Sequence, residues 1–355
     1  MHIVISGYFG FGNEGDEAIL QSMIDALKNI HPTIRLTVLS NNPEQTKALY
    51  KVNAVNRWKL GNIRKALKHS DGLISGGGSL LQDKTSMKSI PYYTGIIHLA
   101  RLYKKPIFIY AQGMGPISHP ISKYLTRLAL NRQSKITVRD NKSLRLLEEM
   151  NIKQPIIEVP DAVFGLKSNL HESTWLKDNK FECYIAISIR PWSNSESFTS
   201  ELVKILDDLS VEGFQIVFIP MHDSDDTEVA LEVSNKMSQP AFHVPVDTPL
   251  NEKLTIIKNA EVLLGMRLHA LIFSGIVGTP FGAFSYDPKI DALANKLKQP
   301  LLTHVNNKQQ ADLKKQTLNF IHKRNYFKNQ LIHSVDELKQ AADDTAKQAI
   351  DYFKP

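Results

Sequence analysis

The fold is decided by HIVISGYFGFGNEGDEAILQSMIDALKNIHPTIRLTVLS, residues 2–40. Residues 2–7 form a β-branched apolar run that predicts a strand, and residues 17–30 repeat apolar side chains at helical spacing. The glycine-rich residues 9–16 predict a loop between them, and residues 35–40 predict a second strand. A strand, a helix and a second strand in this order form a βαβ unit, which favours a parallel sheet.

The same alternation continues along the chain in two series. In the first series, further strands are predicted at 72–77, 106–113, 135–140 and 156–161, and further helices at 96–103 and 143–151. In the second series, strands are predicted at 182–190, 214–222, 241–246, 261–266 and 280–286, and helices at 200–213, 226–237 and 252–260.

These patterns predict an α/β fold with two Rossmann-like domains, GT-B-like, and a C-terminal helix. Residues 164–180 lack strong periodicity and are expected to be the linker. We therefore expect an N-terminal domain over 1–170, a C-terminal domain over 181–333, and the helix over 334–355. In such folds, ligands bind at the carboxyl ends of the strands.

Bulk composition restricts the partners of this chain. It has 355 residues, of which 42% are hydrophobic and 22% charged, as is typical of a soluble globular protein. The net charge of +7 favours anionic partners, with local basic clusters at Arg57–His69 and Arg101–Lys105. The sequence contains no zinc-finger pattern, RNA-binding aromatic signature or long polybasic arm, so we predict no nucleic-acid partner.

Neither a signal peptide nor a membrane span is predicted. The N-terminus lacks a basic region and a small-residue cleavage site. The longest apolar run, residues 269–284, is shorter than the ~20 residues of a spanning helix and contains Pro280. We expect a cytoplasmic location, with peripheral contact at the inner face of the cell membrane as an alternative.

Cys183 is the single cysteine of the chain. It has no intramolecular partner for a disulfide, and it lies in an apolar strand pattern. We expect a buried structural thiol rather than a nucleophile.

The first loop, Gly10–Gly15, matches the GxGxxG pattern of dinucleotide sites. Two features argue against a dinucleotide. The loop is extended by Gly7–Phe9, and the second strand ends in Ser40–Asn42, where an acidic ribose partner is expected. Glycines such as Gly12 still allow a ligand to approach the backbone, and the following helix N-terminus favours an anion.

Asp16 and Glu17 occupy that helix N-terminus. They can cap the helix, because acidic side chains are favourable there. For Asp16 an acid/base role is an equal alternative.

Two further glycine-rich segments end predicted strands. Gly76–Ser79 is expected to expose backbone amides before a helix starts, and Gln112–Pro116 ends another strand. Tight turns are the alternative function of such glycines. Three such strand ends would line one rim of a sheet, with Gly77 and Gly78 beside a ligand.

Charged residues also follow strand patterns. Arg139 and Asp140 end one strand and are expected to point into a cleft, with a surface ion pair as the alternative. Arg190 ends a strand of the second series and has the same two interpretations.

Arg267, Leu268 and His269 follow the strand at 261–266, and Lys289 follows the strand at 280–286. Guanidinium forks, an ammonium and an imidazole together suit a ligand with both a carboxylate and a phosphate. His222 lies beside Asp223, Asp225 and Asp226, which also suit a helix start, and we predict no metal.

Taken together, these motifs resemble the polysaccharide pyruvyltransferases, and within them the CsaB-type enzymes of bacterial cell-wall polymers. The matching segments are GYFGFGNEGDEAIL, ISGGGSLLQDKTS, PYYTGI, YAQGMGP, TVRD, SIRPW, VFIPMHDSDD, GMRLHALIFS and SYDPK. They extend from the first strand to Lys289, and no diagnostic motif follows Pro300.

The resemblance implies a GT-B-like fold and transfer of the pyruvyl group of phosphoenolpyruvate to a sugar as a 4,6-ketal. For CsaB-type enzymes it implies a lipid-linked N-acetylmannosamine acceptor and a secondary cell-wall polymer that anchors S-layer proteins. Phosphoenolpyruvate is a co-substrate, and no cofactor is implied. The family's residues correspond to Arg139, Arg267, His269 and Lys289, and less closely to Arg190.

The sequence therefore gives a mechanistic hypothesis. Arg139 and Arg267 hold the donor's carboxylate and phosphate, Lys289 neutralises the leaving phosphate, and His269 is a general acid/base. Candidate bases for the sugar hydroxyls are Asp16, Asp140 and Asp161. The hypothesis requires Arg139 to converge with the second-series residues in a gap between two lobes.

Two other functions stay open at this stage. One is a GT-B glycosyltransferase that uses a nucleotide sugar, because such enzymes also bind a diphosphate at a helix N-terminus. The other is a non-catalytic protein that binds anions at a membrane surface.

Overall fold

The computed structural model describes residues 1–84, 86–132, 134–167, 170–192, 196–307, 310 and 312–354, with residues 223 and 224 described for the backbone only. The chain forms two compact units. Unit 1 comprises Met1–Lys167 and Leu338–Pro355, and unit 2 comprises Ser168–Glu337.

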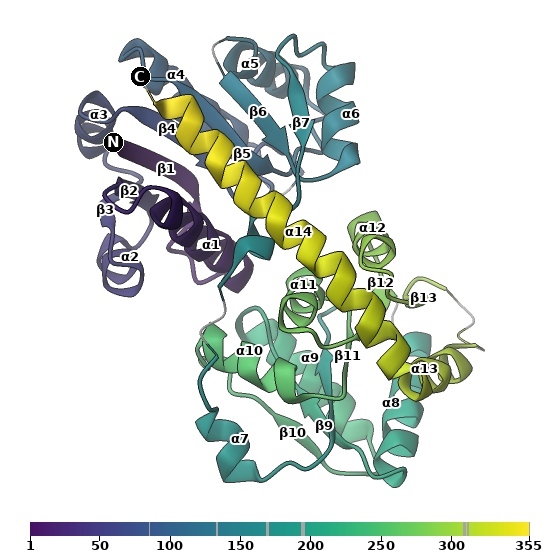
Figure 1. Ribbon diagram of the computed structural model, residues 1–355. Helices are drawn as coiled ribbons and strands as arrows, with labels where there is room; N and C mark the ends of the chain where they lie inside the picture. The colour runs from purple at the N-terminus through teal and green to yellow at the C-terminus, as the bar shows by residue number, and fades with distance from the viewer. Residues whose placement is uncertain are drawn as a thin grey trace. The chain divides into compact units, whose positions relative to one another are not determined.

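Unit 1 is built on a seven-stranded parallel sheet with the order β3-β2-β1-β4-β5-β6-β7 (Figure 1). The strands are β1 (His2–Phe9), β2 (Arg35–Ser40), β3 (Asn53–Asn56), β4 (Gly72–Gly76), β5 (Ile107–Gln112), β6 (Ser134–Val138) and β7 (Ile156–Glu158). The central strands β1, β4 and β5 are buried along most of their length, as in parallel sheets covered on both faces.

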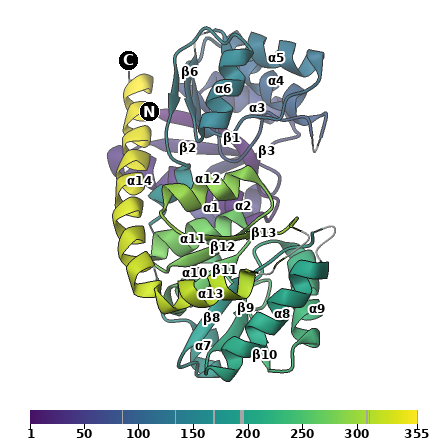
Figure 2. The ribbon, with the colours of Figure 1, turned by 90° about the vertical axis from the view of Figure 1, so that its right-hand side faces the viewer.

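Helices cover both faces of this sheet. One face packs against α3 (Leu60–Lys68), α4 (Ser89–Leu102), α5 (Pro120–Leu130) and α6 (Asn141–Glu149), which share one apolar core with the strands. Figure 2 shows α4, α5 and α6 together beside β6. The other face carries α1 (Glu14–Ile30), the short 3₁₀ helix η1 (Ala162–Gly165) and the end of α14 (Arg324–Phe353), where Tyr352 and Phe353 contact Phe108. The helix α2 (Pro43–Tyr50) joins β2 to β3.

Unit 2 repeats the design with a six-stranded parallel sheet of order β10-β9-β8-β11-β12-β13. Its strands are β8 (Tyr184–Ser188), β9 (Gln215–Phe218), β10 (Ala241–His243), β11 (Val262–Gly265), β12 (Phe281–Ser285) and β13 (Leu301–His304). Its helices are α7 (Thr174–Asn179), α8 (Glu196–Val211), α9 (Asp223–Lys236), α10 (Leu250–Asn259), α11 (Leu268–Val277), α12 (Pro288–Lys296), α13 (Leu313–His322) and the first part of α14.

The predicted α/β fold with two Rossmann-like halves and a C-terminal helix is confirmed. The sequence missed β3 and β13, because each has four residues at an outer strand position and too little apolar alternation to predict a strand. The last helix begins at Arg324, ten residues before the predicted start at Ser334.

Two local predictions were wrong. No helix starts directly after Gly78 and Ser79, because α4 begins only at Ser89. Cys183 is partly exposed rather than buried, since it lies just before β8, although burial still raises the pKa of its thiol.

Among the described residues, none of the helices combines the length and the apolar character needed to cross a bilayer.

Candidate active site

The glycine-rich segments of unit 1 follow strands that lie side by side. β1, β4, β5 and β6 are consecutive neighbours in the parallel sheet, so their carboxyl ends meet at one edge. The segments that follow them contain Gly10, Gly78, Gly113 and Arg139. The predicted rim of three glycine-rich strand ends is therefore confirmed, and Arg139 belongs to the same edge.

The first loop is fixed by side chains that the sequence did not assign correctly. Asn13, rather than Asp16 or Glu17, caps α1, because its Oδ1 accepts the Asp16 backbone N–H at 3.1 Å. Glu17 instead accepts the Gly10 backbone N–H at 2.7 Å and the Tyr50 hydroxyl at 2.6 Å. Glu17 therefore secures the loop, and its expected capping role was wrong.

Asp16 is left facing the second glycine segment. A Cβ at Gly78 would collide with Oδ1 of Asp16, and Gly78 has a φ of +63°, so both space and backbone conformation require glycine there. Burial raises the pKa of Asp16 to about 7, a rise that Arg139 opposes and that Glu17 and Asp161 reinforce. A carboxyl group that titrates near neutrality can both donate and accept a proton.

Arg139 is a buried cation at the centre of this edge, with 9% of its side chain exposed. Its Nη1 donates to Oδ2 of Asp161 at 2.5 Å, and its Nη2 donates to Oγ of Ser79 at 3.0 Å. Burial lowers the pKa of Arg139, but Asp161, Asp140 and Asp16 together outweigh burial, and the net shift is upward. Gly113 lies directly against the guanidinium, since a Cβ there would be 2.9 Å from Nε.

Asp140 and Asp161 differ in their surroundings. Oδ1 of Asp140 caps α6 through the Ser143 backbone N–H at 2.7 Å, and its Oδ2 lies 3.9 Å from Nε of Arg139. Asp161 caps η1 through the Val163 N–H at 3.1 Å and is the principal partner of Arg139. The alternative of a surface ion pair between Arg139 and Asp140 does not hold, because the principal partner of Arg139 is the buried Asp161.

The remaining glycines of the prediction lie in the first and second glycine-rich segments. Gly12 is exposed in the first loop and has a φ of +75°. Gly77 is buried beside Phe9 and Ile19 with a φ of +88°.

Unit 2 gathers cations at the corresponding edge of its own sheet. β8, β11 and β12 are consecutive neighbours. Arg190, Arg267 and Lys289 follow these three strands in turn. Because the strands are parallel, all three residues lie at the carboxyl edge, as the sequence predicted.

Arg267 is held in place by a buried carboxylate. Its Nε lies 3.1 and 3.0 Å from the two carboxylate oxygens of Asp226, and its Nη2 also donates to Asp226. The Asp226 side chain is 1% exposed, and it also accepts the backbone N–H groups of Met221 and His222 at 3.2 and 3.1 Å. The sequence suggested only a helix start for Asp226. The pairing was not visible because 41 residues separate the partners.

Leu268 and His269 open the helix α11, and both are partly buried. Arg267 is the N-cap residue of that helix, so the imidazole of His269 lies in its first turn. The His269 and Phe273 rings have centroids 6.2 Å apart. His269 is therefore placed at the cationic edge, two residues after Arg267.

Lys289 lies in the first turn of α12, where its backbone N–H donates to the capping carboxylate of Asp287 at 2.9 Å. The side chain is partly buried.

Arg190 is held by aromatic groups. Its Nη1 donates to the Tyr286 hydroxyl at 3.1 Å, and its guanidinium carbon lies 5.1 Å from the centre of the Tyr286 ring. Trp192 packs against the same ring at 4.6 Å, and its Nε1 donates to Asn306 at 2.7 Å. Arg190, Trp192, Phe198 and Met266 contribute to a cavity of about 210 Å³.

Within unit 1 the structure brings Asp16, Arg139 and Asp161 together. Within unit 2 it places Arg190, Arg267 and Lys289 at one edge of the sheet, after β8, β11 and β12. The convergence of Arg139 with the unit 2 residues stays a prediction. The sequence missed the anchoring partners Ser79, Tyr50, Asp226 and Tyr286, because hydroxyl groups and lone carboxylates have no diagnostic spacing.

The family model for polysaccharide pyruvyl transferase matches residues 13–288, which contain Asp16, Arg139 and Asp161 of unit 1 and Arg190, Arg267 and His269 of unit 2. This chain therefore belongs to the polysaccharide pyruvyl transferase family. It is a pyruvyltransferase enzyme with a role in polysaccharide synthesis.

A curated relative is the amylovoran biosynthesis protein AmsJ of Erwinia amylovora. It is 22% identical to this chain, and the match covers 84% of this chain and 87% of the relative.

Solved structures share the fold at low identity. The UDP-GlcNAc 2-epimerase of Neisseria meningitidis, solved with UDP-GlcNAc, is 11% identical with a TM-score of 0.67 and covers 99% of this chain and 100% of its own. A glycosyltransferase of Rickettsia africae is 12% identical with a TM-score of 0.64, and the match covers 99% of this chain and 97% of that protein. Anabaena HepE, in complex with UDP-glucose, is 10% identical with a TM-score of 0.62, covering 99% of each chain. These likenesses confirm the GT-B-like fold.

Proposed function

We propose that this enzyme transfers the pyruvyl group of phosphoenolpyruvate to two hydroxyls of one sugar, forming a 4,6-ketal. The proposed acceptor is a lipid-linked N-acetylmannosamine unit of a secondary cell-wall polymer, as in the CsaB-type enzymes. The reaction takes place in the cytoplasm, at the inner face of the membrane that carries the lipid. The observation that carries the donor assignment is the row of three cations after adjacent strands, with Arg267 fixed by Asp226.

The donor's two anionic groups match this row of cations. Arg267 is oriented by the buried Asp226 carboxylate, so its remaining Nη1 edge is presented to a ligand without first having to be ordered. In the proposed reaction Arg267 binds one anionic group of phosphoenolpyruvate, and Lys289 neutralises charge on the leaving phosphate. Arg190, held over Tyr286, contributes a further positive charge.

Arg139 has a more constrained role. Two of its nitrogens already donate to Asp161 and Ser79. The first proposed role of Arg139 is a direct contact with the donor's carboxylate. The second role of Arg139 is electrostatic, because its positive charge opposes the effect of burial on the pKa of Asp16.

The first step protonates the methylene carbon of phosphoenolpyruvate and adds one sugar oxygen to the central carbon. We assign the proton donor to His269 and the base that accepts the hydroxyl proton to Asp16, whose pKa of about 7 suits proton exchange at neutral pH. The product is a phosphorylated ketal precursor with a new methyl group.

In the second step the bond between the central carbon and the phosphate oxygen breaks, and phosphate leaves with the bonding electrons. The neighbouring sugar hydroxyl then bonds to the same carbon, and its proton is passed to the released phosphate. Overall, one enol phosphate and one diol give one cyclic ketal and inorganic phosphate, so atoms and charges balance.

The test measures phosphate release from phosphoenolpyruvate together with the mass of the acceptor product. We expect His269→Ala and Arg267→Ala each to lower kcat/KM by at least about 100-fold, because each loses a group that acts in the transition state. Near-wild-type rates in both variants would overturn the site assignment.

Matched controls come from the same unit. His304→Ala changes a histidine at the end of β13 whose side chain is 53% exposed. Arg324→Ala breaks an ion pair with Glu261 of 2.7 Å outside the strand edge. Both controls are expected to retain rates within about threefold of wild type. Thermal shifts with phosphoenolpyruvate and with UDP-sugars separate this donor from a nucleotide sugar, because a bound ligand stabilises the folded protein.

A further inference from the structure

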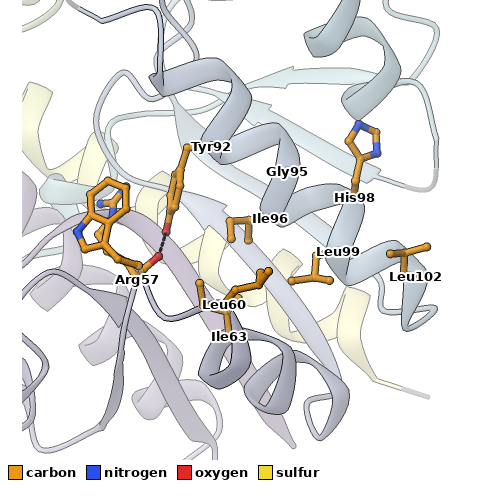
Figure 3. A pocket seen from close by; sticks show the side chains of 10 residues that line it. Arg57, Leu60, Ile63, Tyr92, Gly95, Ile96, His98, Leu99 and Leu102 are labelled. Carbon is orange, nitrogen blue, oxygen red and sulfur yellow. Dashed lines mark hydrogen bonds between the residues drawn. The ribbon is translucent and has the colours of Figure 1, made fainter.

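A groove on the surface of unit 1 lies outside the residues used above. It has a volume of about 410 Å³ and runs between α3 and α4. Figure 3 shows Leu60 and Ile63 of α3 facing Ile96 and Leu99 of α4. Its lining is almost entirely apolar, so its natural occupant is a hydrocarbon group.

Large apolar side chains around this groove are exposed to water. Trp58, Leu60 and Leu102 are 63%, 58% and 78% exposed, and all three line the groove. On the neighbouring helix α5, which packs against α4, Ile121 and Tyr124 are 63% and 65% exposed. An extended apolar surface of this kind marks an interaction site.

The same three helices contain basic residues and no acidic ones. Neither residues 57–70 nor residues 84–139 contain an Asp or Glu. The exposed cations of this face are Lys59, Arg64, Lys65, Lys68, Lys88, Lys104, Lys123, Arg127 and Arg132. The opposite side of the sheet differs, because α1, α2 and the end of α14 carry acidic residues such as Asp25, Glu44 and Asp343.

We propose that this face, made of α3, α4 and α5, seats unit 1 on a lipid bilayer with anionic headgroups, and that the groove between α3 and α4 takes a hydrocarbon chain. Apolar side chains surrounded by cations are the combination that binds helices to such a surface. Trp58 and Tyr124 supply amphipathic rings, which are favoured at the boundary between headgroups and water. A protein that binds this face would need an acidic surface with its own apolar ridge. Binding of such a protein, rather than of vesicles, is the alternative outcome of the test.

The inner end of the groove approaches the first glycine loop. Arg57 lines the groove, and its Nη1 donates to the carbonyl of Gly7 at 2.9 Å. Its guanidinium carbon also lies 5.1 Å from the centre of the Phe11 ring. The surface that binds lipid is therefore joined through Arg57 to the loop that precedes Asp16. This inference extends the membrane contact in the proposed function by naming the surface, but vesicle binding itself does not depend on the reaction.

The experiment is co-sedimentation of the full chain with vesicles of phosphatidylglycerol and phosphatidylcholine, compared with phosphatidylcholine alone. We expect binding only to the anionic vesicles and weaker binding at high salt. Replacing Lys65, Lys68 and Lys104 by Gln together is expected to lower the partition coefficient by on the order of 100-fold, at about fivefold for each cation. Leu60→Glu with Leu102→Glu is expected to lower it further.

Matched controls lie on the opposite side of the sheet. Leu49 of α2 is 59% exposed, almost the same as Leu60, so Leu49→Glu tests for a general effect of adding a carboxylate. Replacing Lys47, Lys51 and Lys347 by Gln removes the same net charge away from the proposed face. Both controls are expected to bind vesicles within about twofold of wild type.

Absence of vesicle binding, or equal losses in the face and control variants, would overturn the proposal. Capture of an acidic protein without vesicle binding would also overturn it in favour of a protein partner. Phosphate release measured with a water-soluble acceptor reports the reaction independently of membrane binding. Face variants should retain turnover within about twofold, so a failure of the lipid surface and a failure of pyruvyl transfer give different results.

Discussion

The carboxyl edges of the two sheets use opposite electrostatic designs. In unit 1, the central cation Arg139 is balanced by Asp161, and the neighbouring Asp16 has a pKa of about 7. In unit 2, three cations follow adjacent strands, and the buried carboxylate of Asp226 orients one of them. The comparison shows that two similar sheets can carry different edges, with a titratable carboxyl group beside a balanced cation in unit 1 and a row of cations in unit 2.

The largest expected effect is a loss of stability on replacing either arginine, and it should be greater for Arg139, which is more deeply buried than Arg267. Arg139→Met leaves Asp161 without its cation in a buried site, and we expect a loss of about 3–5 kcal/mol in the free energy of unfolding. Arg267→Met should cost less, about 2–3 kcal/mol, because Asp226 keeps two backbone N–H donors and Arg267 is 17% exposed. Urea unfolding of both variants measures the difference.

A second substitution tests the cause of that loss. Arg139→Met combined with Asp161→Asn removes the uncompensated charge and should recover part of the stability. If the double variant is no more stable than Arg139→Met, the lost stability comes from packing rather than from charge.

The next effect tests the raised pKa of Asp16 at the edge of unit 1. The folded pKa of Asp16, about 7, lies above the ordinary value of 3.8. The folded state therefore keeps a proton that the unfolded state releases, and Asp16 lowers stability progressively as the pH rises from about 4 to about 7. Asp16→Asn removes this penalty. The free energy of unfolding of the variant, relative to that of wild type, should therefore increase by about 2–3 kcal/mol between pH 5 and pH 8. Thermal or urea unfolding at the two pH values checks the sign.

Asn13→Ala is the control for this pH effect. It removes the α1 cap beside Asp16 without removing a titratable group, and it should cost about 1 kcal/mol at both pH values. A stability difference between Asp16→Asn and wild type that is the same at pH 5 and pH 8 would contradict the raised pKa.

The smallest effect concerns anion binding in unit 2. Tyr286→Leu removes both the hydroxyl and the ring that hold Arg190, and we expect the KM for phosphoenolpyruvate to rise about 5–30-fold with kcat within threefold. Tyr286→Phe keeps the ring and should cause a smaller rise. A fall in kcat with unchanged KM would place Tyr286 in the chemical step instead.

Much of the candidate site could be predicted because parallel sheets follow strict geometric rules. Arg139, Arg190, Arg267 and Lys289 each follow a strand pattern, and parallel strands end at a common edge. The roles of single carboxylates could not be predicted in the same way. Asp16 and Glu17 are adjacent in the sequence, yet Glu17 secures Gly10 and Tyr50 while Asp16 faces Gly78.

The sequence by itself determined the two α/β halves, the strand ends that carry glycines and cations, and the family to which the chain belongs. Local apolar periodicity and ordered motifs encode these features, and neither depends on distant contacts. Only the tertiary structure decided that Asp161 is the partner of Arg139, that Asp226 orients Arg267, and that the basic residues of α3, α4 and α5 surround an apolar groove. The physical reason is that burial, pKa and ion pairing depend on groups that are far apart in the chain and meet only when it folds.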